Sequence, residues 1–173
     1  MAETNNVSDT RDARRERPGF AAEYGVEMRP EGMLPWAWVD EQMREARSYW
    51  VATTRPDGRP QVIPVWGVWI DETFYFGTST GSRKARNLAV NPAIAVHLES
   101  GDDVVILEGV VDVLSDAALF DRYADVYEAK YAVRPGDGDG SDGINYAVRP
   151  HRVLAWLERD FLTTPTRWTF DLP

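Results

Sequence analysis

A cationic stretch that begins at Ser82 carries the clearest chemical meaning in this sequence. Arg83 and Lys84 follow Ser82, directly after a loop of small residues at 77–81, and the pattern predicts a helix over residues 82–91. The first turn of a helix has backbone N–H groups without intrahelical partners and a partial positive charge, so acidic side chains are favoured there. Cations in this turn therefore indicate that an anion binds to it.

Phosphate is the anion that these groups suit best. Oriented N–H donors, the Ser82 hydroxyl and the two cations Arg83 and Lys84 together form a phosphate-binding arrangement. The small residues of the 77–81 loop allow the backbone to approach a ligand closely. The usual alternative for Arg and Lys on a helix is a solvated charged face, but position in the first turn favours a binding site.

The 77–81 loop also allows a hydrolase interpretation, which its surroundings disfavour. Its sequence, GTSTG, matches the G-x-S-x-G nucleophile elbow, and His151 lies downstream of it, as a Ser-Asp-His catalytic triad would require. That fold needs a mostly parallel sheet, whereas the connections here are too short for parallel crossovers. We expect no metal site, because His97 and His151 have no ligand partners at suitable spacing, although a haem ligand remains open.

Strand signals dominate the middle of the chain and predict a mainly β protein with a few helices. The predicted strands are residues 49–54, 61–70, 73–78, 93–99, 104–114 and 152–158, and the predicted helices are 39–47, 82–91 and one that begins at 115. Hairpin turns connect the first strands, so the strands are antiparallel neighbours. Five or six such strands with inserted helices indicate a small β-barrel.

Composition limits the classes of function. The 173 residues carry a net charge of -9, which argues against a nucleic-acid or membrane-surface binder, and they include no Cys. No apolar run approaches the roughly 20 residues of a spanning helix, and we expect a cytoplasmic protein. The polar residues 1–35 are expected to form a flexible or draped N-terminal arm, and residues 36–173 the folded domain.

Several segments at fixed spacing resemble a known superfamily. They are DGRPQVIPVW at 57–66, FYFGT at 74–78, SRKARNLAVNP at 82–92 and VILEG at 105–109. The ordered set is similar to the pyridoxamine 5'-phosphate oxidase-like FMN-binding split-barrel superfamily, and within it to the flavin/deazaflavin oxidoreductase branch. The resemblance implies a six-stranded antiparallel split β-barrel, a homodimer, and an isoalloxazine-type cofactor at each dimer interface.

The resemblance also implies roles for individual residues. The cofactor ring is expected to lie along one strand, its phosphate at the following helix start, and a residue of the partner subunit on the far side of the ring. The implied cofactor-binding residues are Val62, Ile63, Pro64, Val65, Trp66, Thr78, Ser82, Arg83, Lys84 and Val104. Trp66, together with Trp168 in the C-terminal tail, is expected to wall the substrate pocket. No residue is assigned as catalytic.

Departures from the family pattern narrow the expected activity. True pyridoxamine-phosphate oxidases carry Arg, Lys and Gln where this chain has Ile63, Val68 and Val104, and their C-terminal signature is absent. The resemblance therefore implies hydride transfer between a deazaflavin, coenzyme F-420, and a small unsaturated or aromatic substrate. FMN is the alternative cofactor, and a non-catalytic flavin- or haem-binding protein is the alternative function.

Overall fold

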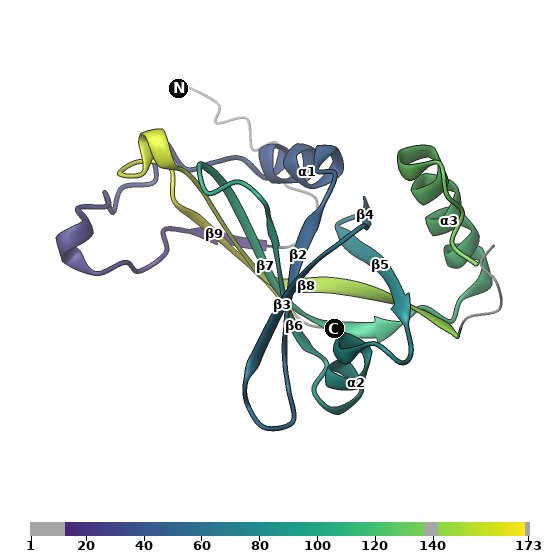
Figure 1. The fold of residues 1–173 in the computed structure, drawn as a ribbon. Coiled ribbons are helices and arrows are strands. Elements are labelled where there is room, and N and C mark those ends of the chain that lie inside the picture. The colour runs from purple at the N-terminus through teal and green to yellow at the C-terminus, as the bar shows by residue number, and fades with distance from the viewer. Residues whose placement is uncertain (1–12, 137–141, 172–173) are drawn as a thin grey trace.

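The computed structural model describes residues 13–136 and 142–171, and shows a mainly β protein (Figure 1). Three α-helices occur in this part of the chain: α1 (Trp36–Glu45), α2 (Arg83–Val90) and α3 (Ala117–Tyr131). The strands are β1 (Ala13–Glu16), β2 (Tyr49–Thr54), β3 (Pro60–Val65), β4 (Val68–Ile70), β5 (Thr73–Ser79), β6 (Ala93–Leu98), β7 (Asp103–Val113), β8 (Gly143–Leu157) and β9 (Thr166–Phe170). Two short 3-10 helices, η1 (Ala22–Tyr24) and η2 (Glu158–Asp160), complete the described elements.

The strands form one antiparallel sheet that does not close. Its main order is β1-β9-β8-β7-β6-β2-β3, while β5 pairs with β8 and β4 pairs with β5. β3 therefore ends the main path and has a partner on one side only, and β3 and β5 do not pair with each other. This strongly curved, open sheet is consistent with a split barrel (Figure 1).

The strand count of six is corrected to nine within the described residues. The expected strand over 61–70 is interrupted at Trp66 and Gly67, because β3 pairs with β2 whereas β4 pairs with β5. β8 begins at Gly143, nine residues before the predicted start at Arg152. Two further strands lie near the ends of the chain, where β1 pairs with β9 and β9 pairs with β8.

The main core lies on the concave side of the sheet beneath α1. Its fully buried side chains come from strands that are distant in sequence, and include Tyr49, Phe74, Phe76, Leu107 and Trp168. A second, smaller cluster lies under α3 and joins that helix to β4 and β5. The two clusters hold α1 and α3 against opposite faces of the short strand β4, because Trp69 packs in the main core and Val68 and Ile70 pack in the smaller cluster (Figure 1).

The described part of the N-terminal arm, residues 13–35, lies on the barrel, as the draped alternative of the prediction describes. β1 adds to the sheet edge, and the buried guanidinium of Arg17 donates hydrogen bonds to the carbonyl oxygens of Arg29, Glu31 and Pro165 at 2.8, 2.6 and 2.8 Å. A planar guanidinium that satisfies three carbonyls links the arm to the C-terminal segment. Residues 1–12 lie outside the described residues.

Candidate functional site

The start of α2 is built as the sequence predicts. Ser82 is the N-cap residue, and its Oγ accepts a hydrogen bond from the Ala85 backbone N–H at 3.1 Å. Thr78, near the end of β5, donates its hydroxyl to the same Oγ at 3.1 Å. The cap thus fixes the helix start to the end of β5, and the remaining N–H groups of the first turn point away from the helix.

The cations of this turn have no ion-pair partner among the described residues. Arg83 is exposed and Lys84 is half-buried, and neither approaches a described carboxylate within ion-pair distance. Burial lowers the pKa of the Lys84 ammonium, as expected where no carboxylate compensates its charge. The residues present therefore fit a bound anion such as a phosphate.

The free edge of β3 lies beside this helix. The Asn87 amide donates to Gln61 Oε1 at 3.0 Å, which joins α2 to the start of β3. Val62 and Trp66 are 52% and 43% exposed, and Pro64 is also exposed. Pro64 lies in an edge strand, where a residue without an N–H is tolerated. The structure thus places α2, which carries the predicted phosphate residues, beside the start of the predicted ring strand.

The last turn of α3 fixes the opposite end of β3. The Tyr131 hydroxyl accepts a hydrogen bond from the Gly67 N–H at 3.1 Å and lies 2.8 Å from the Gly67 carbonyl oxygen. Lys130 Nζ donates to the same carbonyl at 3.2 Å. A Cβ at position 67 would collide with the Phe74 ring. These contacts hold the break between β3 and β4, which determines where Trp66 lies.

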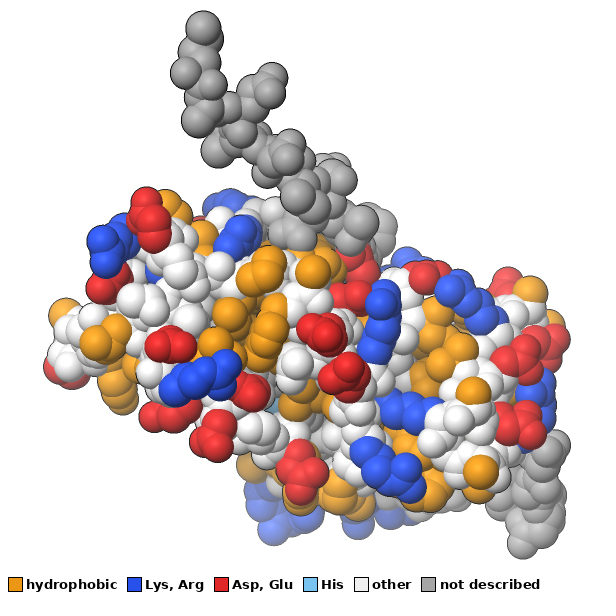
Figure 2. Space-filling view, turned by 90° about the horizontal axis from the view of Figure 1, so that it is seen from above, with side chains coloured by type: hydrophobic (Ala, Val, Ile, Leu, Met, Phe, Trp, Pro, Cys, Tyr) orange, Lys and Arg blue, Asp and Glu red, His pale blue; other side chains and the backbone are white. Residues whose placement is uncertain are grey.

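Trp66 lies flat on the ring of Tyr131. The two centroids are 4.7 Å apart, the planes differ by 4°, and the Arg47 guanidinium carbon is 5.7 Å from each centroid. Lys and Arg side chains gather on the surface between α1 and α3 (Figure 2). Sequence reasoning missed Arg47, Lys130 and Tyr131 as site residues. The helical spacing after residue 115 predicted α3, but no local signal showed which strand the end of that helix contacts.

Lys130 is charged in an environment without a carboxylate. Its Nζ donates to the Tyr49 hydroxyl at 2.9 Å and to the carbonyl oxygens of Gly67 and Arg44 at 3.2 and 3.4 Å. Burial, with a smaller contribution from the Arg47 guanidinium, lowers the pKa of the ammonium from its ordinary 10.5 to about 8. All three acceptors are uncharged, so burial disfavours the charged form.

This lowered pKa predicts a pH dependence of stability. Between about pH 8 and 10 the unfolded chain binds the proton that native Lys130 has lost, so the free energy of unfolding rises with pH. Allowing for solvent screening of a half-buried group, we expect the free energy of unfolding to rise by about 1–2 kcal/mol over this range. The variant Lys130→Met should lack this rise. Above about pH 10 the trend reverses, because burial raises the pKa of Tyr49. Urea unfolding across this range measures it, and an unchanged slope in Lys130→Met would contradict it.

Two predicted site residues lie elsewhere. Trp168 is fully buried in the main core beside Trp36, so the expectation that it walls a substrate pocket is corrected. Its position in β9 places the ring on the concave face of the sheet, where an aromatic side chain fills core volume. Val104 is buried on β7, opposite Trp156 of β8, and β2 and β6 separate its strand from β3. Within one chain it does not reach the site, and its role toward a partner subunit stays a prediction.

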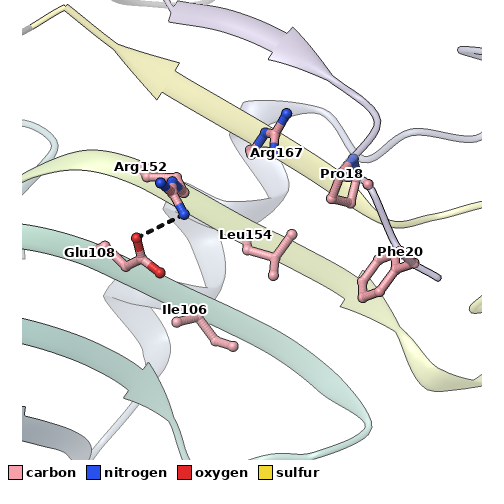
Figure 3. Close-up of a pocket in the computed structure, with 8 residues that line it drawn as sticks. Pro18, Phe20, Ile106, Glu108, Arg152, Leu154 and Arg167 are labelled. Atoms are coloured by element: carbon pink, nitrogen blue, oxygen red, sulfur yellow. Dashed lines mark ion pairs between the residues drawn. The ribbon is translucent and has the colours of Figure 1, made fainter.

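A hollow of about 170 Å³ lies on the outer face of β7 and β8, away from the start of α2 (Figure 3). Ile106 and Leu154 line its floor, Phe20 of the arm borders it, and Glu108 pairs with Arg152 at 3.2 Å. Its charged side chains are already paired, and the hollow lies across the sheet from the start of α2. It therefore does not belong to the anion site.

The histidines do not join the site. His97 stacks on Trp50 with centroids 6.3 Å apart, and its Nδ1 lies 2.7 Å from the Leu98 carbonyl oxygen. His151 is the extra residue at the irregularity where β8 passes Glu108 and Gly109, and its buried Nδ1 has no partner. In the described part of the chain, no three His, Cys, Asp or Glu side chains are grouped so that they could hold a metal ion. Nor is any helix there long and apolar enough to span a membrane.

The open antiparallel barrel with its α2 insertion is the split-barrel class of fold, as comparisons with known proteins support. Residues 37–157 match the pyridoxamine 5'-phosphate oxidase family, and the chain belongs to that family. A pyridoxine/pyridoxamine 5'-phosphate oxidase of Gluconobacter oxydans is 37% identical over 94 residues, which cover 50% of this chain. The match spans only 46% of that relative's length.

Solved structures share the fold. A conserved hypothetical protein of Mycobacterium tuberculosis superimposes with a TM-score of 0.65 at 23% identity, covering 78% of this chain and 91% of the other. An F420 reductase superimposes with a TM-score of 0.53 at 29% identity, covering 72% of this chain and 98% of the other. The first shows the fold alone, and the second is similar to this chain in both fold and sequence.

Proposed function

We propose that this protein is a cytoplasmic oxidoreductase that transfers a hydride between a deazaflavin, coenzyme F-420, and a small unsaturated or aromatic substrate. The observation that carries the proposal is the unpaired cationic start of α2 beside the free edge of β3. Membership of a family that includes oxidoreductases supports the reaction class. The similarity to an F420 reductase supports the deazaflavin, and FMN is the alternative cofactor.

The residues have distinct parts in this proposal. Arg83 and Lys84, with the Ser82 hydroxyl, hold the phosphate, and Thr78 orients that hydroxyl through its 3.1 Å hydrogen bond. The edge of β3, from Val62 to Trp66, offers backbone groups and apolar side chains to the ring. When bound, the cofactor supplies the hydride. The protein supplies binding, orientation and exclusion of water.

Oxidation of pyridoxamine phosphate is not proposed. The chain has Ile63 and Val68 at the places where such oxidases carry Arg and Lys, so charged groups for that substrate are missing from the ring strand. Ile63 is partly buried and packs against the main core, and Val68 is buried under α3. Neither position therefore presents a polar group at the opening.

A homodimer completes the proposed site. On the convex face of the sheet, Pro64, Trp50, His97, Ile106 and Leu154 are neighbours across five strands. The arm borders this mostly apolar row at Ile106 and Leu154, and the row continues to Pro64 of the predicted ring strand. We propose that a second copy packs on this face and brings its Val104 toward the ring. The buried apolar surface would supply the binding energy.

Cofactor titration and single-turnover kinetics test the proposal. Purified protein is titrated in turn with F-420, FMN and haem and followed by absorbance. We expect saturable binding of F-420, and anaerobic reoxidation of the reduced coenzyme by unsaturated or aromatic acceptors. Tight haem binding without flavin binding would establish the non-catalytic alternative. Flavin binding without turnover of any acceptor would indicate a carrier.

A further inference from the structure

Two cations lie beside the stacked pair of Trp66 and Tyr131, and neither has a carboxylate partner among the described residues. The Arg47 guanidinium contacts the rings of Trp66 and Tyr131 and forms no ion pair with any residue that the structure describes. Lys130 Nζ lies 5.5 Å from the Tyr131 centroid, and its hydrogen-bond acceptors are all uncharged. This corner is locally cationic on a chain whose net charge is -9.

The neighbouring charges show that the imbalance is local. Arg44, three residues before Arg47, pairs with Asp40 at 2.7 Å. Arg47 lines a hollow of about 270 Å³ together with Glu45, Glu99 and Asp103, yet it pairs with none of these carboxylates. Asp103 pairs with Arg159 instead, at 2.9 Å. The Arg47 guanidinium instead lies at the edge of the stacked pair, with its carbon at the same distance from both ring centroids. Its N–H groups remain available to an acceptor.

The site formed by Trp66, Arg47 and Lys130 combines three recognition elements. Trp66 is stacked on one face by Tyr131 and is 43% exposed, so it offers a rigid flat apolar surface. Arg47 adds a planar fork of donors that matches a carboxylate. Lys130 adds a fixed positive charge, held in place by Tyr49 and Gly67. A ligand that uses all of them is planar and carries a carboxylate.

We infer that Arg47 and Trp66 determine substrate specificity, and that the substrate is a planar unsaturated or aromatic carboxylate bound at the end of β3. This inference rests on the proposed function, because it places the substrate beside the ring strand. The phosphate site at the start of α2 and the carboxylate site at Arg47 lie at opposite ends of β3. A ring bound along β3 therefore has the two anions at its two ends.

The test compares a planar acid with its neutral isostere. Affinities of trans-cinnamate and cinnamamide are measured at about pH 7 by calorimetry, on cofactor-free and cofactor-loaded full-length protein. We expect wild type to bind cinnamate at least about tenfold more tightly than cinnamamide. In Arg47→Gln the two affinities should agree within about twofold, and Arg47→Lys should retain part of the preference.

Controls separate the sources of the effect. Arg44→Gln removes the same charge from a paired side chain nearby and should keep the preference for cinnamate. Arg47→Gln should leave F-420 and FMN affinity unchanged within about twofold, which separates a substrate carboxylate from an anionic group of the cofactor. Trp66→Leu should weaken both ligands together, since stacking does not depend on their charge.

The outcomes also distinguish the two proposals. No cinnamate binding, equal affinity for both ligands in wild type, or an unchanged preference in Arg47→Gln would overturn the inference. Hydride transfer to neutral acceptors with no effect of Arg47→Gln would overturn it while the proposed function stood. Failure of every cofactor to bind, with an Arg47-dependent preference retained in the cofactor-free protein, would overturn the function and leave the carboxylate site.

Discussion

The double variant Arg83→Ala/Lys84→Ala is expected to lose about 3–6 kcal/mol of cofactor binding, or about 10²- to 10⁴-fold in affinity. Each side chain supplies a charge-assisted contact to the phosphate at the start of α2. Neither cation has an ion-pair partner among the described residues, so the cofactor is the group that loses its contacts. Absorbance titration with F-420 and FMN measures the change.

A matched control removes two positive charges elsewhere. Arg59 pairs with Asp57 in the turn before β3, and Arg122 pairs with Asp71 in the turn before β5. Replacing Arg59 and Arg122 together by Ala should leave cofactor affinity within a few fold, because both side chains are exposed and already paired with a carboxylate. Equal affinity of the Arg83/Lys84 double variant and wild type would refute the phosphate assignment.

The stability of the cofactor-free protein is a second property to measure in Arg83→Ala/Lys84→Ala. Cations are unfavourable in the first turn of a helix, by about 0.3–1 kcal/mol each. Removing Arg83 and Lys84 should therefore leave the cofactor-free protein as stable as wild type or slightly more stable, in urea unfolding. A large loss of stability would instead show that the two side chains serve the fold.

Trp168→Ala is expected to lower the free energy of unfolding by about 3–5 kcal/mol. The side chain is 0% exposed and makes an edge contact with Trp36 at a centroid distance of 5.5 Å. Its removal leaves a cavity beneath α1, where Met43 and Val39 are also fully buried. Chemical denaturation followed by far-UV circular dichroism measures the loss.

The matched control for Trp168→Ala is the same substitution at Trp66, whose side chain is exposed. Trp66→Ala should cost less than about 1.5 kcal/mol of stability, because it removes one stacked pair on the surface. It should affect ligand binding instead. Trp168→Phe should recover part of the stability, since a smaller ring still fills most of the space. Equal losses for Trp66→Ala and Trp168→Ala would contradict the placement of the two rings.

Local pattern determined the order of the elements. The tight turn predicted at Asp71 and Glu72 is present, with φ of 46° and 57°, and a hairpin of this kind is specified by residues adjacent in sequence. The helix predicted over 82–91 begins after Ser82, since capping and charge are read within a single turn. Turns and helix caps of this kind depend on residues that are adjacent in sequence. They can therefore be predicted without knowledge of the tertiary structure.

Side-chain placement depended on strand pairing. Trp66 and Trp168 are the same residue type, yet the edge position of β3 exposes one and the pairing of β9 with β8 buries the other. The break at Gly67 depends on contacts from α3, more than 60 residues away.

By itself, the sequence determined the antiparallel β class and the resemblance to the family, and it predicted an anion site at the start of α2. Only the tertiary structure decided that Arg47, Lys130 and Tyr131 meet Trp66, or that residues 13–35 join the barrel. The physical reason is that these contacts join segments far apart in the chain. No local propensity or spacing encodes which distant surfaces will pack together.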